Sequence, residues 1–173
     1  MIMPRGHQRL LLPAKPWFIL LSLLLALFID MLPLGAAPAM PQVVAVVLVF
    51  WNVHQSRRIG VGWAFLLGLI VDVSHGAVLG QHALAYSGLA FAAVSLHRRL
   101  LWFGVLEQML HVLPLFAFAH LLMVGVRLAV GGMAPSPWLM AAPLLETLLW
   151  PLAHALLLAP QRRAPARDEH RPL

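Results

Sequence analysis

Apolar residues in this chain are grouped into long runs, and polar residues are concentrated between them. Six runs can be distinguished: Pro16–Leu34, Pro41–Val53, Ile59–Val73, Ala83–Leu96, Leu100–Val130 and Trp138–Ala159. A bilayer core is about 30 Å thick, and a helix needs about 20 apolar residues to cross it. The pattern therefore predicts an all-α membrane protein with six transmembrane helices. We expect one transmembrane domain over residues 1–160 and a basic cytoplasmic tail at 161–173.

Two runs depart from the length of a simple span. Pro41–Val53 would form only about 20 Å of helix, so it requires a thinned bilayer or its flanking residues. Leu100–Val130 would be about 46 Å long as a single helix, and Pro114 near its middle predicts a kink. The first run has a rival interpretation as a signal peptide, because Gly35–Ala39 offers small residues for cleavage. A signal core usually has about 7–15 apolar residues, so the longer run favours a retained helix.

Composition and charge agree with a membrane protein. The chain is 61% apolar and 10% charged, whereas soluble domains have about 45–50% and 25%. Three basic residues precede the first run, two lie between the second and third, two lie between the fourth and fifth, and four are in the tail. Arg127 alone falls in the alternate connections, so the positive-inside rule predicts that both termini are cytoplasmic. The net charge of +6 is thus explained by basic residues that set the orientation in the membrane, and nucleic-acid binding is not expected.

Acidic residues within apolar runs need a reason, since insertion scales give about 2.5–3.5 kcal/mol for a charge at mid-membrane. We interpret Asp30 as a solvated residue at the outer end of the first helix. Asp72 precedes a glycine-rich segment and is expected to accept hydrogen bonds from its backbone, organising that turn. Partner binding is the alternative role for Asp72.

Polar residues also recur along the last two helices. Glu107 and His111 are four residues apart and are expected to pair on one face, with His120 close to that face. On the sixth helix, the same spacing recurs at Glu146, Trp150 and His154. We expect the two stripes to face each other or to line a water-filled crevice. A buried polar network between the helices is the favoured role, and a substrate or proton path and a contact for another membrane protein are the alternatives.

Small residues form a further pattern. Gly60, Ala64 and Gly68 are spaced by four, which predicts close approach of the third helix to a neighbour. Gly76 and Gly80 repeat this spacing, and helix packing is the favoured use for them as well.

The sequence carries no complete catalytic motif. No H-E-x-x-H, P-loop or G-x-G-x-x-G motif occurs, and the absence of cysteine excludes thiolate sites. Ser87 with His111 or His120 is the nearest approach to an intramembrane serine protease, but Ala85 stands where a rhomboid-like motif has glycine. This leaves no serine-protease motif intact.

Carboxylate and metal chemistry have equally little support. Asp30 and Asp72 lack the G-x-G-D context of an aspartyl dyad. His75 and His82 could bind a metal, although such residues are more often ordinary polar groups of a loop. We predict a protein that is not an enzyme and uses no cofactor or metal.

Several short segments, taken in order, resemble the MreD family of rod shape-determining proteins over roughly residues 16–163. These segments are 49–55 (VFWNVHQ), 57–60 with its paired arginines, 68–72 (GLIVD), 76–86 ending in LGQHALAY, 97–103 (HRRLLWF) and 158–163 (LAPQRR). No single one is diagnostic, but their order and spacing together are specific.

The resemblance implies a scaffold of the bacterial inner membrane within the peptidoglycan elongation complex, required for rod cell shape. It implies MreC as the main partner, with MreB, RodA and the penicillin-binding transpeptidase of RodA in the same complex, and self-association left open. It also implies a fold similar to the substrate-binding subunit of energy-coupling-factor transporters. The alternative function is therefore a small-molecule binding subunit or transporter, with a polar crevice between helices five and six.

Candidate site residues fall into two groups. Residues expected to bind a partner or to organise the loops are Asp72, Gly76, Gly80, His82, Arg57, Arg58, Arg98 and Arg99. Residues expected in a buried polar network are Glu107, His111, Glu146 and His154.

Overall fold

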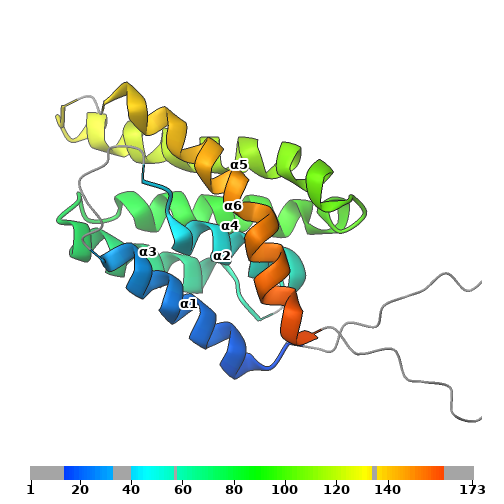
Figure 1. Cartoon of the computed structure of the whole chain (residues 1–173). Helices are drawn as coiled ribbons and strands as arrows, with labels where there is room; N and C mark the ends of the chain where they lie inside the picture. The colour runs from blue at the N-terminus through cyan, green and yellow to red at the C-terminus, as the bar shows by residue number, and fades with distance from the viewer. Residues whose placement is uncertain (1–13, 33–39, 57, 134–135, 162–173) are drawn as a thin grey trace, which may run out of the picture.

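The computed structural model describes residues 14–32, 40–56, 58–133 and 136–161, and all regular structure in these residues is helical (Figure 1). The helices are α1 (Pro16–Met31), α2 (Val43–His54), α3 (Val61–His75), α4 (Gln81–Leu100), α5 (Val105–Ala129) and α6 (Ala142–Leu158). Short 3-10 segments, η1 (Pro137–Ala141) and η2 (Ala159–Gln161), flank α6. Each of the six apolar runs holds one α-helix, so the predicted number of helices is confirmed for the described chain.

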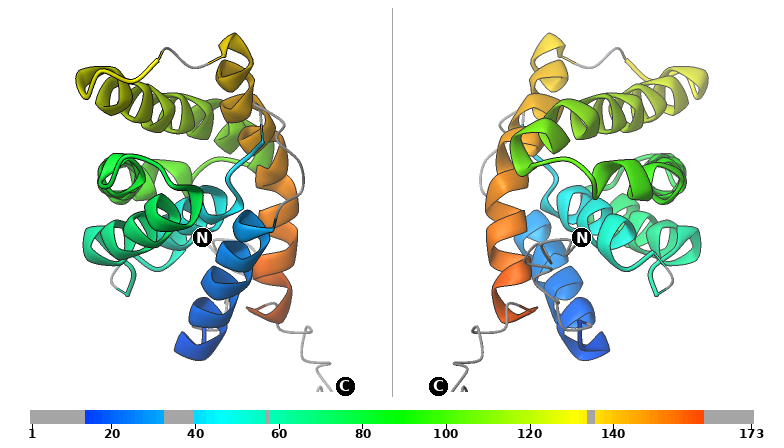
Figure 2. Two further views of the ribbon diagram at one scale, coloured as in Figure 1. Left: turned by 90° about the vertical axis from the view of Figure 1, so that its left-hand side faces the viewer. Right: turned by 90° about the vertical axis from the view of Figure 1, so that its right-hand side faces the viewer.

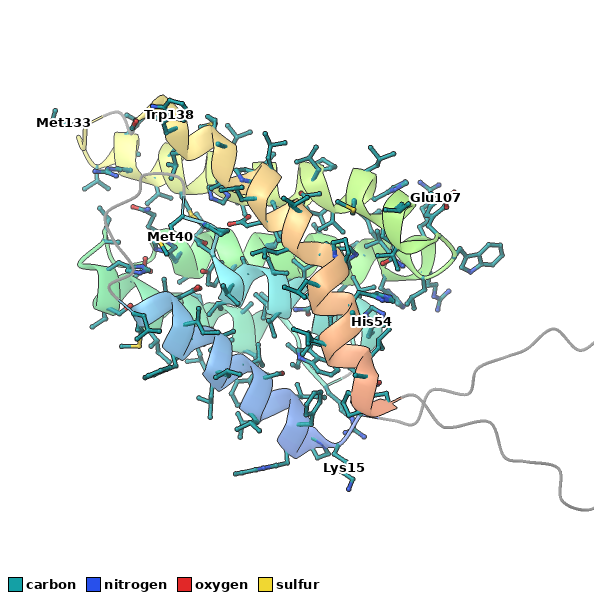
Figure 3. All side chains as sticks on the ribbon, viewed as in Figure 1. Lys15, Met40, His54, Glu107, Met133 and Trp138 are labelled. Carbon is teal, nitrogen blue, oxygen red and sulfur yellow. The ribbon has the colours of Figure 1, made fainter. Side chains whose placement is uncertain are left out.

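Successive helices run in alternating directions. Figure 3 shows Lys15, His54 and Glu107 on one side of the bundle and Met40, Met133 and Trp138 on the opposite side. We refer to these sides as the Lys15 end and the Met133 end. The beginning of α1 and the end of α6 lie together at the Lys15 end (Figure 1).

The centre of the bundle is α2, which packs against α1, α4 and α6 (Figure 2). All ten residues from Val44 to Val53 are buried. With 12 residues, α2 is about 18 Å long, shorter than a bilayer core. Its contacts with α1, α4 and α6 enclose it, and its need for a thinned bilayer or for its flanking residues stays a prediction.

Two described helical segments are long and apolar enough to cross a membrane alone: Val105–Ala129 and Trp138–Gln161. The helices α1, α2 and α3 are apolar but shorter, with 16, 12 and 15 residues. Pro114 lies inside α5, which continues as helix through it. Pro143 lies in the first turn of α6, where a proline removes no helical hydrogen bond.

The tightest helix contact joins α3 to α4. A Cβ atom on Gly68 would lie only 2.4 Å from the Cα of Ala83, so only glycine fits, and the predicted close packing is confirmed there. Ala64 is fully buried on the same helix, whereas a Cβ on Gly60 would meet no atom within 4 Å.

Gly76 and Gly80 have a different role from the predicted one. Gly76 ends α3 with φ of +58°, and Gly80 precedes α4 with φ of +97°. A Cβ on either would meet no atom within 4 Å, so they do not serve close packing. Glycine is needed at both positions because other residues rarely adopt a positive φ.

Candidate functional site

Asp72 fixes the turn between α3 and α4. Its Oδ2 accepts hydrogen bonds from the backbone N–H groups of Gly80 (2.9 Å) and Ala83 (3.3 Å). Its Oδ1 accepts one from the N–H of His82 at 2.8 Å and lies 2.7 Å from His82 Nδ1. A carboxylate here satisfies unpaired N–H groups of the first turn of α4 and lies at the positive end of the helix dipole. The predicted hydrogen bonding of Asp72 to this turn is confirmed.

Asp30 performs the same task for α2. Its two carboxylate oxygens accept hydrogen bonds from the N–H groups of Val43 (2.8 Å) and Val44 (2.9 Å). The interpretation of Asp30 as a solvated residue is therefore wrong, because the half-buried side chain accepts hydrogen bonds from the first N–H groups of a neighbouring helix. The unpaired N–H groups at a helix start provide the physical reason.

Glu146 of α6 reaches the same end of α2. Its side chain is fully buried, and Oε1 accepts a hydrogen bond from the N–H of Gln42 at 3.1 Å. The same oxygen lies 3.6 Å from Nε2 of His120, and Tyr86 donates its hydroxyl hydrogen to the Gln42 side chain at 3.0 Å. Carboxylates from α1 and α6 thus converge on the N-terminus of the central helix.

Glu107 and His111 do not belong to this network. Both are exposed, and His111 Nδ1 contacts the backbone oxygen of Glu107 at 3.0 Å while its ring stacks on Phe103. The Glu107 carboxylate instead accepts a hydrogen bond from the N–H of Gly104 at 3.3 Å. Thirteen residues of helix are about 3.6 turns, so Glu107 and the buried His120 lie on nearly opposite sides. The expectation that His120 lies close to the face of Glu107 is wrong for this reason, and the side chains of Glu107 and His111 share an exposed face without pairing.

The stripe on α6 packs against two helices. Trp150 donates its indole N–H to Gln108 Oε1 of α5 at 3.1 Å. His154 packs its ring against Phe50 and His54 of α2, with ring centroids 6.1 Å and 5.6 Å apart. Trp150 thus contacts α5 and His154 contacts α2, so α6 faces both helices.

Sequence reasoning misses two glutamines in this network, Gln42 and Gln108. Gln108 donates to the carbonyl oxygens of Leu100 (3.0 Å) and Phe103 (3.1 Å), which tie the α4–α5 connection. Both glutamines are uncharged, so a search for charges inside apolar runs passes over them. The position of Gln42 directly before a run of valines is the signal that could have identified a helix start.

The basic candidates lie at the Lys15 end. Arg58 donates an Nη1 hydrogen to the carbonyl oxygen of Ala14 at 2.9 Å, joining the α2–α3 connection to the start of α1. Arg98 and Arg99 are exposed in the last turn of α4, where positive charge is favourable. Arg57 lies outside the described residues, as does the tail from residue 162.

Ser87, His75 and His82, the candidates for catalysis or metal binding, contact other residues of the bundle. The Ser87 hydroxyl donates to the carbonyl oxygen of Ala83 at 2.7 Å, and the rings of His75 and His82 are 5.8 Å apart. Within the described ranges, no three His, Cys, Asp or Glu side chains form a group that could hold a metal ion.

Comparison with known proteins identifies the family. The family model for the rod shape-determining protein MreD matches residues 13–159. The chain belongs to the MreD family. The rod shape-determining protein MreD of Haemophilus influenzae is 36% identical over 74 residues, which cover 41% of this chain and 46% of that protein. The aligned part is therefore about half of that MreD relative. No solved structure matches the chain.

The family and the Haemophilus influenzae relative are both described as rod shape-determining proteins. MreD proteins are a structural family not known as enzymes. Together with the apolar helices, the family indicates a membrane protein.

Proposed function

We propose that this chain is a non-enzymatic, multi-pass scaffold of the bacterial inner membrane, which binds MreC and links MreB to RodA and its transpeptidase during peptidoglycan elongation. The match to MreD over residues 13–159 carries the proposal. Six membrane spans with both termini in the cytoplasm are part of it.

The distribution of charge supports this orientation. Lys15, Arg58, Arg98 and Arg99 belong to the start of α1, the α2–α3 connection and the end of α4. These segments lie at the Lys15 end, whereas Arg127 lies in the last turn of α5, at the Met133 end. By the positive-inside rule the Lys15 end faces the cytoplasm and the Met133 end faces the periplasm.

The use of carboxylates supports a structural protein in a bilayer. Backbone N–H groups cannot find water in a bilayer core, so short helices need partners within the protein. Asp30, Asp72 and Glu146 supply these partners to α2 and α4. A helix as short as α2 can therefore lie inside the membrane domain.

The turn between α3 and α4 is the surface that we assign to MreC. Leu79 is 70% exposed on this turn, and Val73 is 73% exposed in the last turns of α3. Asp72 holds the turn in one conformation through backbone hydrogen bonds, and a preordered surface loses less entropy on binding. An apolar contact on a fixed turn suits a single helix of a partner.

Co-purification tests this assignment. The tagged protein is recovered from its own membranes in mild detergent, and MreC is measured by mass spectrometry. Leu79→Asp should lower MreC recovery about tenfold. This corresponds to a loss of about 1.4 kcal/mol of binding free energy when one apolar contact residue is removed. Substitutions at Gly76 and Gly80 are avoided, because their positive φ would strain any other residue.

Leu101→Asp is the matched control, an exposed leucine in the connection at the Lys15 end. Its MreC recovery should equal that of the unsubstituted protein. Equal loss from both variants would contradict the assigned surface. Recovery of a transport ATPase without cell-wall proteins would contradict the scaffold itself.

A further inference from the structure

A cavity of about 420 Å³ opens at the Met133 end, between the α3–α4 turn and the last turns of α5. Its volume is within the range of about 300–1,000 Å³ that is usual for ligand sites. The polar side chains that line it are Gln42, His75, Gln81, His82 and Arg127. Apolar residues from the same elements complete the wall.

The cavity carries a positive charge that its own wall does not neutralise. Among the described residues, no Asp or Glu lines it. Asp72 lies behind the wall, where its Oδ1 contacts Nδ1 of the wall residue His82 at 2.7 Å and its oxygens accept hydrogen bonds from N–H groups at the start of α4. Asp30 serves the start of α2, and Glu146 is fully buried. Within the described part of the chain, no acceptor is bonded to the guanidinium of Arg127. The cavity therefore favours an anion.

Arg127 is an exposed residue in the last turn of α5, beside a glycine turn. The N–H of Gly132 donates to the carbonyl oxygen of Arg127 at 2.9 Å, and Gly131 has φ of +80°. A Cβ on Gly132 would lie 2.9 Å from Cγ of Arg127. The first part of the arginine side chain thus lies next to the glycine turn, at the mouth of the cavity.

The remaining walls are preformed. Asp72 fixes the α3–α4 turn, and Tyr86 orients the amide of Gln42, whose Nε2 lies 3.6 Å from Sδ of Met123. Met123 and Leu139 provide apolar surface beside these polar groups. A ligand with both a charged and an apolar part would match this lining.

We propose that this cavity binds a phosphate diester carrying hydroxyl groups and an apolar part, with Arg127 as its counter-ion. One guanidinium balances the single charge of a diester and can donate two hydrogen bonds to its oxygens. His75 and Gln81 at the rim can bond hydroxyl groups of the ligand. The ligand is a lipid headgroup or a soluble diester of the same chemistry.

The test uses purified full-length protein and two probes with one headgroup. Phosphatidylglycerol is offered in nanodiscs of phosphatidylcholine, and glycerophosphoglycerol, which lacks the acyl chains, is offered in solution. Native mass spectrometry measures lipid retention, and calorimetry measures binding of the soluble probe. Arg127→Gln should weaken binding about tenfold through loss of the charged hydrogen bonds.

Two further variants separate the cavity from general attraction. Val124→Trp should also weaken binding about tenfold, because it fills the cavity while retaining the arginine. Arg98→Gln removes an exposed charge at the other end of the bundle and should leave binding unchanged. If Arg127→Gln lowers the unfolding temperature, Val124→Trp and Arg98→Gln decide the matter.

If the protein retains phosphatidylglycerol but does not bind glycerophosphoglycerol, the ligand is a lipid. If it binds glycerophosphoglycerol and both Arg127→Gln and Val124→Trp weaken that binding, the ligand is soluble. Both results support the site. Binding that is unchanged in Arg127→Gln and Val124→Trp, equal loss in Arg98→Gln, or no binding of either probe would overturn it. The measurement contains no cell-wall protein, so its outcome is independent of the scaffold proposal.

Discussion

Asp30, Asp72 and Glu146 each lie beside the start of a helix other than their own. Together they accept hydrogen bonds from the N–H groups of residues at the starts of α2 and α4. A charged acceptor bonded to backbone N–H contributes about 1.5–3 kcal/mol, more than a neutral pair. At the residue scale, these acidic side chains are structural parts of the bundle.

Asp72→Asn should lower the free energy of unfolding by about 2–3 kcal/mol, because the amide replaces one charged acceptor oxygen with a donor. Equilibrium unfolding in mixed detergent micelles measures the change. Glu107→Gln is the control, since Glu107 is exposed and accepts one long hydrogen bond. A loss as large in the control as in Asp72→Asn would show that the buried hydrogen bonds of Asp72 are not responsible.

How far the sequence predicts these roles depends on separation along the chain. Asp72 bonds residues 8 to 11 positions later, so its role could be inferred from the glycine-rich segment that follows. Glu146 and Gln42 are 104 positions apart, and nothing local to either residue indicates the other. The role of Asp30 is not evident from the sequence, because its partners begin the next helix.

At the scale of elements, the runs of apolar residues determine which segments become helices, but not how each helix is rotated. α5 buries Gln108 and His120 and exposes Glu107 and His111. The apolar residues on this helix surround it nearly evenly, so its polar residues alone could not establish the buried face. Contacts with α4 and α6 determine it instead.

Glycine spacing likewise needs its structural context. Gly68→Ala should destabilise the protein by about 1–3 kcal/mol, since the added methyl meets the backbone of Ala83. Gly62→Ala, on the same helix with no atom within 4 Å of the new Cβ, should be neutral or slightly stabilising. Thermal unfolding of the two variants in one detergent provides the comparison, and similar loss in both would contradict the close α3–α4 contact.

At the scale of the whole molecule, alternating helices place the two sets of connections at opposite ends. The absence of cysteine makes single-cysteine labelling direct. Met133→Cys should react with a membrane-impermeant maleimide in spheroplasts, because Met133 is 83% exposed at the proposed periplasmic end. Trp102→Cys, at a position 91% exposed in the α4–α5 connection, should react only after the inner membrane is permeabilised. Labelling of both from one side would exclude the proposed topology.

The enclosed position of α2 also bears on how the protein is made. During synthesis, α2 leaves the ribosome long before α6, whose Glu146 completes the bonding at its N-terminus. Until then, Asp30 can serve Val43 and Val44, but the N–H of Gln42 has no acceptor in lipid, so the short helix is expected to remain in or beside the insertion channel. Chains that terminate before α6 should therefore remain bound to insertion factors or be degraded, which makes biogenesis an all-or-nothing event for this protein.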